Sequence, residues 1–190
     1  PEVMTYTDLP DPVAGSDEVL LDVTAIGINY ADTHQTENSY LSPQTLPMVP
    51  GIEVVGTNAG KRYLASVSSG GYAQRAIAHK SVLFPIPDSV SDQQALCMLV
   101  QGSTAWHLLK TMGNISAGQS VVIHAAAGGV GTIAIQLAKL WGAKVIAVTS
   151  NGDKAELAKR LGADEVVDAN VTNLAKSIKE ANGGRSVDLV

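Results

Sequence analysis

Apolar and polar residues alternate in short runs through the first half of this 190-residue chain, most clearly over 18–28 (EVLLDVTAIGI) and 72–79 (YAQRAIAH). A period of two is typical of strands with one buried face. Proline, glycine and serine separate these runs, and proline cannot donate a hydrogen bond to a strand ladder. Residues 1–94 are therefore predicted to form a mostly antiparallel β domain.

Near residue 95 the pattern changes to apolar runs that alternate with helical stretches. The runs VVI, VIAV, EVV and VDLV begin at residues 121, 145, 165 and 187, so their starts are 24, 20 and 22 residues apart. This spacing leaves room for one helix and two loops in each unit, and continuously apolar strands are typical of a parallel sheet covered on both faces. Residues 95–190 are predicted to form an α/β domain with a doubly wound parallel sheet. Its first helix, over 130–141, places five residues on one core-facing stripe: Val130, Ala134, Leu137, Ala138 and Trp141.

A glycine-rich turn, HAAAGGVG over 124–131, joins the first of these strands to that helix. Glycine lets phosphate oxygens approach backbone N–H groups, and a helix N-terminus adds partial positive charge. The pattern is a degraded G-x-G-x-x-G, which is weak evidence when it stands alone. At the head of a βα repeat it predicts dinucleotide binding, with a tight structural turn as the alternative. The residues predicted to contact the dinucleotide here are Ala126, Ala127, Gly128, Gly129, Val130 and Gly131.

The residues that follow the second predicted strand, which begins at residue 145, indicate whether NADH or NADPH binds. Enzymes that use NAD commonly have an acidic residue there that accepts hydrogen bonds from the adenosine ribose. This chain has Ser150 and Asn151 instead, with Lys154 one turn into the next helix. These three residues are predicted to accommodate the 2′-phosphate of NADPH. The alternative is NADH, with Lys154 a solvated surface lysine.

Composition narrows the classes of partner. The formal net charge is −5, which disfavours binding to nucleic acid or to an anionic membrane. The single cysteine, Cys97, can form no disulfide within the chain, and no apolar run reaches twenty residues. A small-molecule substrate and a reducing, cytoplasmic setting are expected.

Five ordered segments resemble one family. They are GINYADTH (27–34), PGIEVVG (50–56), GGYAQ (70–74), QGSTAWHLL (101–109) and the glycine-rich turn. Together they resemble the zinc-free quinone oxidoreductase, or zeta-crystallin-like, branch of the medium-chain dehydrogenase/reductase superfamily. The resemblance implies a GroES-like domain over 1–94, a Rossmann domain over 95–190, and hydride transfer from NADPH to a quinone.

The resemblance also implies roles for individual residues. Asn29 is expected to border the nicotinamide and the acceptor, unless it is only a turn residue. Asp32 either holds that loop in shape or touches substrate, and His34 either donates a hydrogen bond or proton to the acceptor or only lines the pocket. Gln101 and Thr104 match the segment that contacts the nicotinamide side of the cofactor, although Thr104 could instead be a helix cap.

Zinc is not expected. Zinc-dependent relatives carry cysteine where this chain has Asn29 and histidine where it has Ile52, and one cysteine cannot build a four-cysteine site. Glu53 alone would bind a metal weakly. Without a Lewis acid, reduction of an electron-poor quinone or conjugated alkene is favoured over alcohol oxidation.

Two alternatives remain beside quinone reduction. One is an NADPH-dependent enoyl or alkenal reductase, and the other is an NADPH-binding structural or RNA-binding protein with little turnover. A homodimer is expected by analogy with the family. Because the chain starts at Pro1 and stops on the apolar run ending at Val190, we expect it to be part of a longer protein; the segment 56–71 is also shorter than the family leads one to expect.

Overall fold

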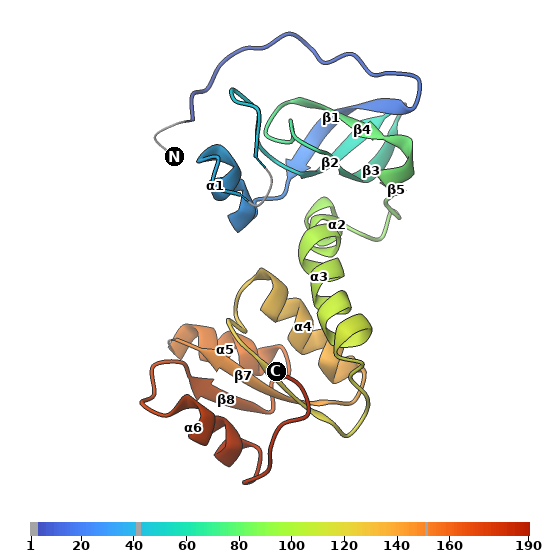
Figure 1. Ribbon diagram of the computed structural model, residues 1–190. Coiled ribbons are helices and arrows are strands. Elements are labelled where there is room, and N and C mark those ends of the chain that lie inside the picture. The colour runs from blue at the N-terminus through green and yellow to red at the C-terminus, as the bar shows by residue number, and fades with distance from the viewer. Residues whose placement is uncertain (1–3, 41–42, 151) are drawn as a thin grey trace. The chain divides into compact units, whose positions relative to one another are not determined.

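The computed structural model describes residues 4–40, 43–150 and 152–190 (Figure 1). The chain divides into two compact units, one ending at Val100 and the other beginning at Gln101. Among the described residues, none of the helices combines the length and the apolar character that crossing a bilayer requires. The assignment of the two units to domains over 1–94 and 95–190 stays a prediction.

The first unit is built on a five-stranded antiparallel sheet, which confirms the predicted β domain. Its strand order is β4 (Arg75–His79), β1 (Glu18–Ile26), β2 (Glu53–Asn58), β3 (Lys61–Ser66) and β5 (Leu83–Pro85). The short helix α1 (Tyr30–Thr36) follows β1, and the single turn η1 (Lys80–Val82) precedes β5. The side chains on one face of the sheet form a hydrophobic cluster that includes the buried residues Leu21, Val54 and Ala65.

A tight hairpin accounts for the short segment between residues 56 and 71. β2 pairs with β3 from Glu53↔Ser66 to Asn58↔Lys61, so only Ala59 and Gly60 connect them. Both have positive φ, 48° and 74°, as the two central residues of the favoured hairpin turn require. The unit closes this connection without additional residues.

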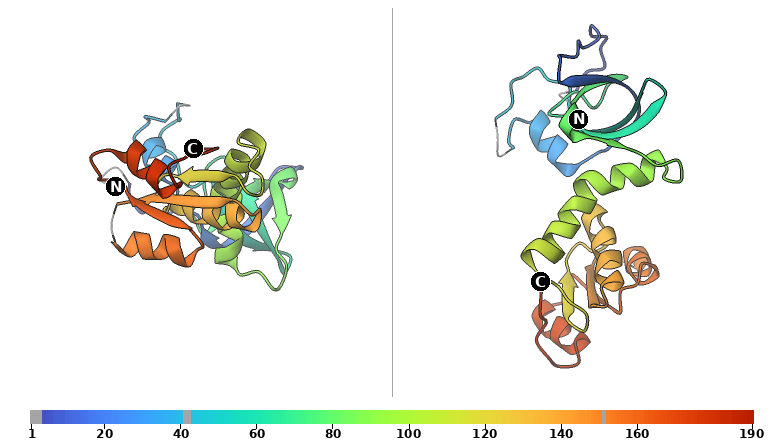
Figure 2. Two further views of the ribbon diagram at one scale, coloured as in Figure 1. Left: turned by 90° about the horizontal axis from the view of Figure 1, so that it is seen from below. Right: turned by 90° about the vertical axis from the view of Figure 1, so that its right-hand side faces the viewer.

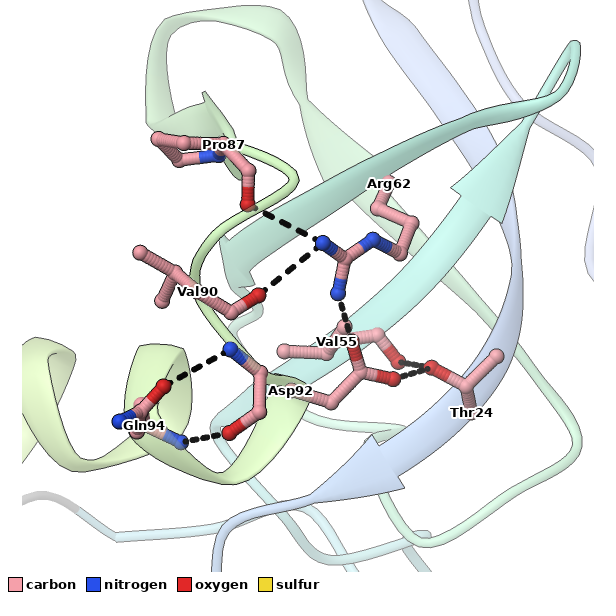
Figure 3. Close-up of polar contacts among 8 residues, drawn as sticks. Thr24, Val55, Arg62, Pro87, Val90, Asp92 and Gln94 are labelled. Atoms are coloured by element: carbon pink, nitrogen blue, oxygen red, sulfur yellow. Dashed lines mark hydrogen bonds and ion pairs between the residues drawn. The ribbon is translucent and has the colours of Figure 1, made fainter.

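The helix α2 (Asp92–Cys97) covers the other face of the sheet, where Ala95 and Leu96 pack against Val55 and Leu64. Polar contacts fix its start (Figure 3). Asp92 accepts hydrogen bonds from Arg62 Nη1 over 2.7 Å and from Thr24 Oγ1 over 2.8 Å. These bonds lower the pKa of Asp92, with the Thr24 bond the largest cause.

Helical backbone continues beyond α2 through η2 (Met98–Gly102), α3 (Ser103–Trp106) and η3 (His107–Met112). Both η2 and η3 are π-helical, a geometry that is often found at functional sites. The run therefore carries Gln101 and Thr104 in helical rather than loop backbone.

The second unit contains a parallel sheet in the order β6 (Ser120–Ile123), β7 (Lys144–Thr149) and β8 (Glu165–Asp168). Helices α4 (Gly129–Leu140) and α5 (Gly152–Arg160) pack on one face and α6 (Leu174–Ala181) on the other, as the left-hand view of Figure 2 shows. This arrangement confirms the predicted βα repeat. The predicted stripe of α4 also faces the core, with Ala134 and Ala138 buried and Val130, Leu137 and Trp141 packed against the same cluster.

The fourth predicted strand, over 187–190, is present only as an isolated parallel bridge between Leu189 and Val121. Val121 lies on β6, which pairs with β7 along its other edge, so the segment extends the sheet beyond β6. The Ser120 N–H and hydroxyl both donate to Asp188 Oδ2, over 2.8 and 2.7 Å, and hold the segment there.

Candidate active site

The N-terminus of α1 carries two of the predicted catalytic residues. Asn29 precedes the helix and Asp32 lies in its first turn. The Asn29 N–H donates to Asp32 Oδ2 over 2.8 Å, and the Asp32 N–H donates to the Asn29 carbonyl oxygen over 3.0 Å. Because Asp32 is only 4% exposed, it is placed to hold this loop in shape. A contact between Asp32 and substrate stays a prediction.

Tyr72 reaches the same carboxylate from a distant part of the chain. Its phenol donates to Asp32 Oδ2 over 2.7 Å. Burial raises the pKa of Tyr72, and the hydrogen bond to Asp32 and the charges of Asp32 and Glu53 raise it further. Tyr72 therefore remains a protonated hydrogen-bond donor at physiological pH.

Glu53, the first residue of β2, is fully buried and lies next to this pair. Asn29 Nδ2 donates to Glu53 Oε1 over 2.9 Å, and the Val100 N–H donates to Glu53 Oε2 over 3.1 Å. Burial raises the pKa of Glu53, and the negative charge of Asp32 adds to the rise, while the two hydrogen bonds oppose it. One carboxylate thus joins the Asn29 loop to the residue that precedes Gln101.

Close backbone approaches explain the glycines of the matched segments. A Cβ on Gly27 would lie 2.2 Å from Glu53 Oε1, and one on Gly71 would lie 2.9 Å from the Gly51 carbonyl carbon. Gly51 also has φ of 94°, which favours glycine. The Tyr72 N–H donates to the Pro50 carbonyl oxygen over 2.8 Å. The segments 27–34, 50–56 and 70–74 therefore pack against one another around Asp32 and Glu53.

His34, the third predicted catalytic residue, makes different contacts. Its Nδ1 lies 3.2 Å from Ser39 Oγ, and its ring meets the Tyr30 ring edge to face at 5.1 Å. It is half-buried. His34 thus contacts Ser39 and Tyr30. A role for His34 in proton donation stays a prediction.

In the second unit, the glycine-rich turn presents the first turn of α4. The Ala126 N–H donates to the Val148 carbonyl oxygen over 3.1 Å, and the Gly128 N–H donates to the Ala125 carbonyl oxygen over 2.8 Å, so both amides are used within the unit. The first N–H groups of a helix have no partner within it, and Gly128 supplies no side-chain cap. The amides at the start of α4 are therefore not capped by a side chain of Gly128, and their contact with the dinucleotide stays a prediction.

Gly131 is required by the fold. A Cβ there would lie 2.6 Å from the Ala125 oxygen and 2.7 Å from Ala126 Cα, both of which are backbone atoms. Only glycine lets α4 approach the end of β6 this closely. The turn also borders a cavity of about 610 Å³ whose other walls come from α3, η3, β6 and residues 189–190. Because this lining is predominantly apolar, a phosphate would be held by the amides of the turn and not by the cavity.

Gln101 lies against the same turn, since a Cβ added to Gly129 would come 3.0 Å from Gln101 Cγ. Thr104 lies inside the helical run, in α3, and the Gly102 backbone before it is already right-handed helical. The alternative role of Thr104 as a helix cap is therefore wrong, because a cap residue has non-helical backbone. Its contact with the cofactor stays a prediction, as does that of Ala127, which is half-buried in the turn.

The carboxyl end of β7 holds the residues predicted to select NADPH. Ser150 and Lys154 are exposed, while Asn151 lies outside the described residues. Asp168, at the end of β8, pairs in register with Thr149 and so lies one position from Ser150. The end of β7 itself carries no carboxylate, as predicted, but the neighbouring parallel strand β8 brings Asp168 to the same edge.

The Asn170 side chain connects the ends of β7 and β8. Its Nδ2 donates to Asp168 Oδ1 over 2.9 Å and to the Ser150 carbonyl oxygen over 3.2 Å. Asp168 also lines a cavity of about 300 Å³ with Thr149 and Lys159. The Asn170 side chain thus links Asp168 to the backbone of Ser150, one of the residues predicted to contact the 2′-phosphate.

Across residues 4–40, 43–150 and 152–190, no three His, Cys, Asp or Glu side chains gather in a way that could hold a metal ion. Glu53, considered from the sequence only as a remnant metal ligand, instead accepts two hydrogen bonds from protein donors. The zinc-free interpretation stays a prediction that rests on the residues at positions 29 and 52.

Comparisons with known proteins agree with this architecture. Residues 15–62 match the alcohol dehydrogenase GroES-like domain and residues 129–190 the zinc-binding dehydrogenase family. Human quinone oxidoreductase is 30% identical over 203 aligned residues, which cover all of this chain and 62% of the human protein. The chain thus spans about six tenths of the length of such curated relatives.

Solved structures give the same result. The quinone oxidoreductase of Thermus thermophilus, determined also in complex with NADPH, is 36% identical with a TM-score of 0.84, covering 95% of this chain and 66% of that one. The Escherichia coli quinone oxidoreductase complexed with NADPH is 31% identical with a TM-score of 0.87, covering 96% and 59%.

An antiparallel sheet followed by a parallel βα unit, with these matches, defines a medium-chain dehydrogenase/reductase. Within that superfamily, the similarity to quinone oxidoreductases supports that branch. The resemblance found from the five sequence segments is confirmed.

Proposed function

We propose that this protein reduces a quinone by hydride transfer from NADPH, without a metal ion. The observation that carries the proposal is the start of α4, where Gly131 allows close packing and the helix begins without a side-chain cap. Its relatives include the human quinone oxidoreductase, and the two solved structures described above were both determined with NADPH. When bound, NADPH supplies a hydride, and the protein supplies binding, orientation and electrostatics.

The residues present fit such a cofactor. The amides of Gly129, Val130 and Gly131 would hold the diphosphate, since helix N-termini favour anions. Ser150 and Lys154 would bind the 2′-phosphate, with Asn151 proposed from the sequence alone. A Cβ on Gly129 would press on Gln101, so both residues belong to one close-packed surface on which a cofactor can lie.

Asn29 would border the nicotinamide and the acceptor, in the position where zinc-dependent relatives carry a metal ligand. An amide that is fixed in advance can stabilise charge developing on a quinone oxygen. The hydrogen bond to Glu53 supports this role because it fixes the orientation of the Asn29 side chain.

Steady-state kinetics with 1,4-benzoquinone, 9,10-phenanthrenequinone and an enone test the proposal. We expect kcat/KM to be higher for the quinones, and a preference for the enone would make the protein an alkenal reductase instead. Tight NADPH binding without turnover of any acceptor would favour the binding protein. The net charge of −5 argues against RNA as its partner.

Two further parts of the proposal concern the setting of the protein. A homodimer is the usual assembly of this branch, and the single cysteine suits the reducing cytoplasm. Size-exclusion chromatography with light scattering tests the first, and fractionation of cells tests the second.

A further inference from the structure

We infer that Glu53 is a positioning residue, whose two carboxylate oxygens set the Asn29 side chain and the Val100 backbone in one fixed arrangement. The inference rests on the proposed function, because Asn29 and Gln101, the neighbour of Val100, are the residues assigned there to the acceptor and the nicotinamide.

The geometry gives each oxygen a separate task. Oε1 accepts from Asn29 Nδ2 over 2.9 Å, and Oε2 accepts from the Val100 N–H over 3.1 Å. The two donors are 71 residues apart in sequence, since Asn29 precedes α1 and Val100 lies in η2. A carboxylate presents acceptors on both oxygens, whereas an amide presents one acceptor and one donor group. A glutamate carboxylate is therefore well suited to accept from both donors, whereas a glutamine presents its NH2 group to one of them.

The Glu53 carboxylate has room only because residue 27 is glycine and has no side chain. A Cβ at that position would lie 2.2 Å from Oε1 and 2.5 Å from Cδ of Glu53. The carboxyl group is consequently fully buried and has little room to change rotamer. Because the carboxylate cannot move, its hydrogen bond with Asn29 Nδ2 also fixes the orientation of the Asn29 side chain.

The charge of Glu53 is unfavourable for stability, which argues for a role beyond it. The titratable groups that act on it are Asp32 from α1, which is another carboxylate, and Tyr72, which is a neutral phenol; η2 contributes only the backbone N–H of Val100. Within the described residues no ion pair joins Glu53 to a lysine or arginine. Buried charges without a cationic partner destabilise a fold, and proteins commonly tolerate such departures at functional sites.

The contacts of Asp92 show how Glu53 differs from a carboxylate with a purely structural role. Asp92 fixes the beginning of the same helical run to the sheet through Arg62 and Thr24 (Figure 3), and it does so with a cationic partner and a lowered pKa. Glu53 fixes the run at Val100 and has neither. Asp92 therefore provides a matched control for a purely structural role.

The test compares E53Q, E53D and D92N in the whole enzyme. In E53Q the new amide group faces one of the two donors, so we expect kcat for a quinone to fall about 10- to 100-fold, as misplacement of about 1 Å can cause. The dissociation constant for NADPH should change less than about threefold, because the phosphate-binding turn belongs to the other unit. E53D keeps the charge but is too short to reach both donors, and it should lose kcat similarly. D92N should lower the thermal midpoint while kcat stays within about threefold.

A spectroscopic reading separates positioning from stability. The side-chain amide resonance of Asn29, assigned by its loss in N29A, should shift in E53Q and should titrate with pH in the wild type in the absence of cofactor and substrate. Its pH dependence should vanish in E53Q. An unchanged resonance, or an E53Q enzyme with normal kcat, would overturn the inference. If the wild type reduces no quinone, the proposed function fails, and the Asn29 resonance alone then decides the role of Glu53.

Discussion

The phenol of Tyr72 donates a hydrogen bond of 2.7 Å to the carboxylate of Asp32, 40 residues earlier in the chain. This contact joins the GGYAQ segment to the loop that carries Asn29. Removing the hydroxyl in Y72F leaves a buried carboxylate oxygen with one donor fewer, so we expect the free energy of unfolding to fall by about 1–3 kcal/mol. Urea denaturation measures the change. Y63F, which alters a tyrosine of β3 outside this cluster, is the control, and equal losses in the two variants would contradict the prediction.

Gly131 should tolerate no side chain. G131A places a Cβ against backbone atoms of Ala125 and Ala126, and relieving that overlap must displace α4. We expect a loss of about 1–3 kcal/mol in the free energy of unfolding and weaker binding of NADPH.

The matched control for stability is G152A, at the start of α5, where an added Cβ meets nothing within 4 Å. Alanine is the better helix former, so G152A should be neutral or slightly stabilising. If G131A were as stable as G152A, the close packing of the turn would not be a requirement.

Asp168 should weaken discrimination in favour of NADPH. Its carboxylate lies beside the end of β7 and repels a 2′-phosphate, which NADH lacks. In D168N the side-chain oxygen still accepts from Asn170, so we expect NADPH to bind about two- to fivefold more tightly, as the energy of an exposed charge pair implies. Fluorescence titration with NADPH and NADH measures both affinities. A parallel change for the two cofactors would show that Asp168 acts only through the fold.

Glu53 should give stability a distinctive pH dependence. Its pKa in the folded protein is raised above the ordinary value of 4.5, so the folded state binds the proton more tightly. The resulting stabilisation is fully present below the unfolded pKa and is lost as pH rises through the folded pKa. The free energy of unfolding of E53Q minus that of the wild type should therefore increase from pH 4.5 to neutral pH.

The other carboxyls with a shifted pKa, Asp92, Asp164 and Asp188, have lowered pKa values and act in the opposite sense: their stabilisation is present above the unfolded pKa and is lost as pH falls. The wild type and E53Q both contain these groups. Subtracting the two free energies of unfolding therefore removes their contribution and leaves that of Glu53. A difference that is flat with pH would contradict the raised pKa.

Periodicity was sufficient for the architecture because alternation and apolar runs report burial locally. β1, β4 and β6 to β8 all fall on predicted runs, and α4 begins within one residue of its predicted start. The start of the helical run at Asp92 also had a local signal, since Ser91 and Gln94 form a capping box that the sequence displays as S-x-x-Q.

The polar site was only partly predictable. Asn29 and Asp32 are close in sequence, but Glu53 reaches Asn29 across 24 residues and Val100 across 47. No spacing rule links such positions. Asp168 was missed for a related reason, because its closeness to Thr149 depends on the register of two parallel strands. The sequence did carry a sign of Glu53 and Tyr72, in the matched segments PGIEVVG and GGYAQ.

A crystal structure of the protein with bound NADPH would locate the diphosphate. We expect its oxygens to lie within hydrogen-bond distance of the backbone N–H groups at Gly129, Val130 and Gly131. A diphosphate bound away from the start of α4 would contradict this expectation.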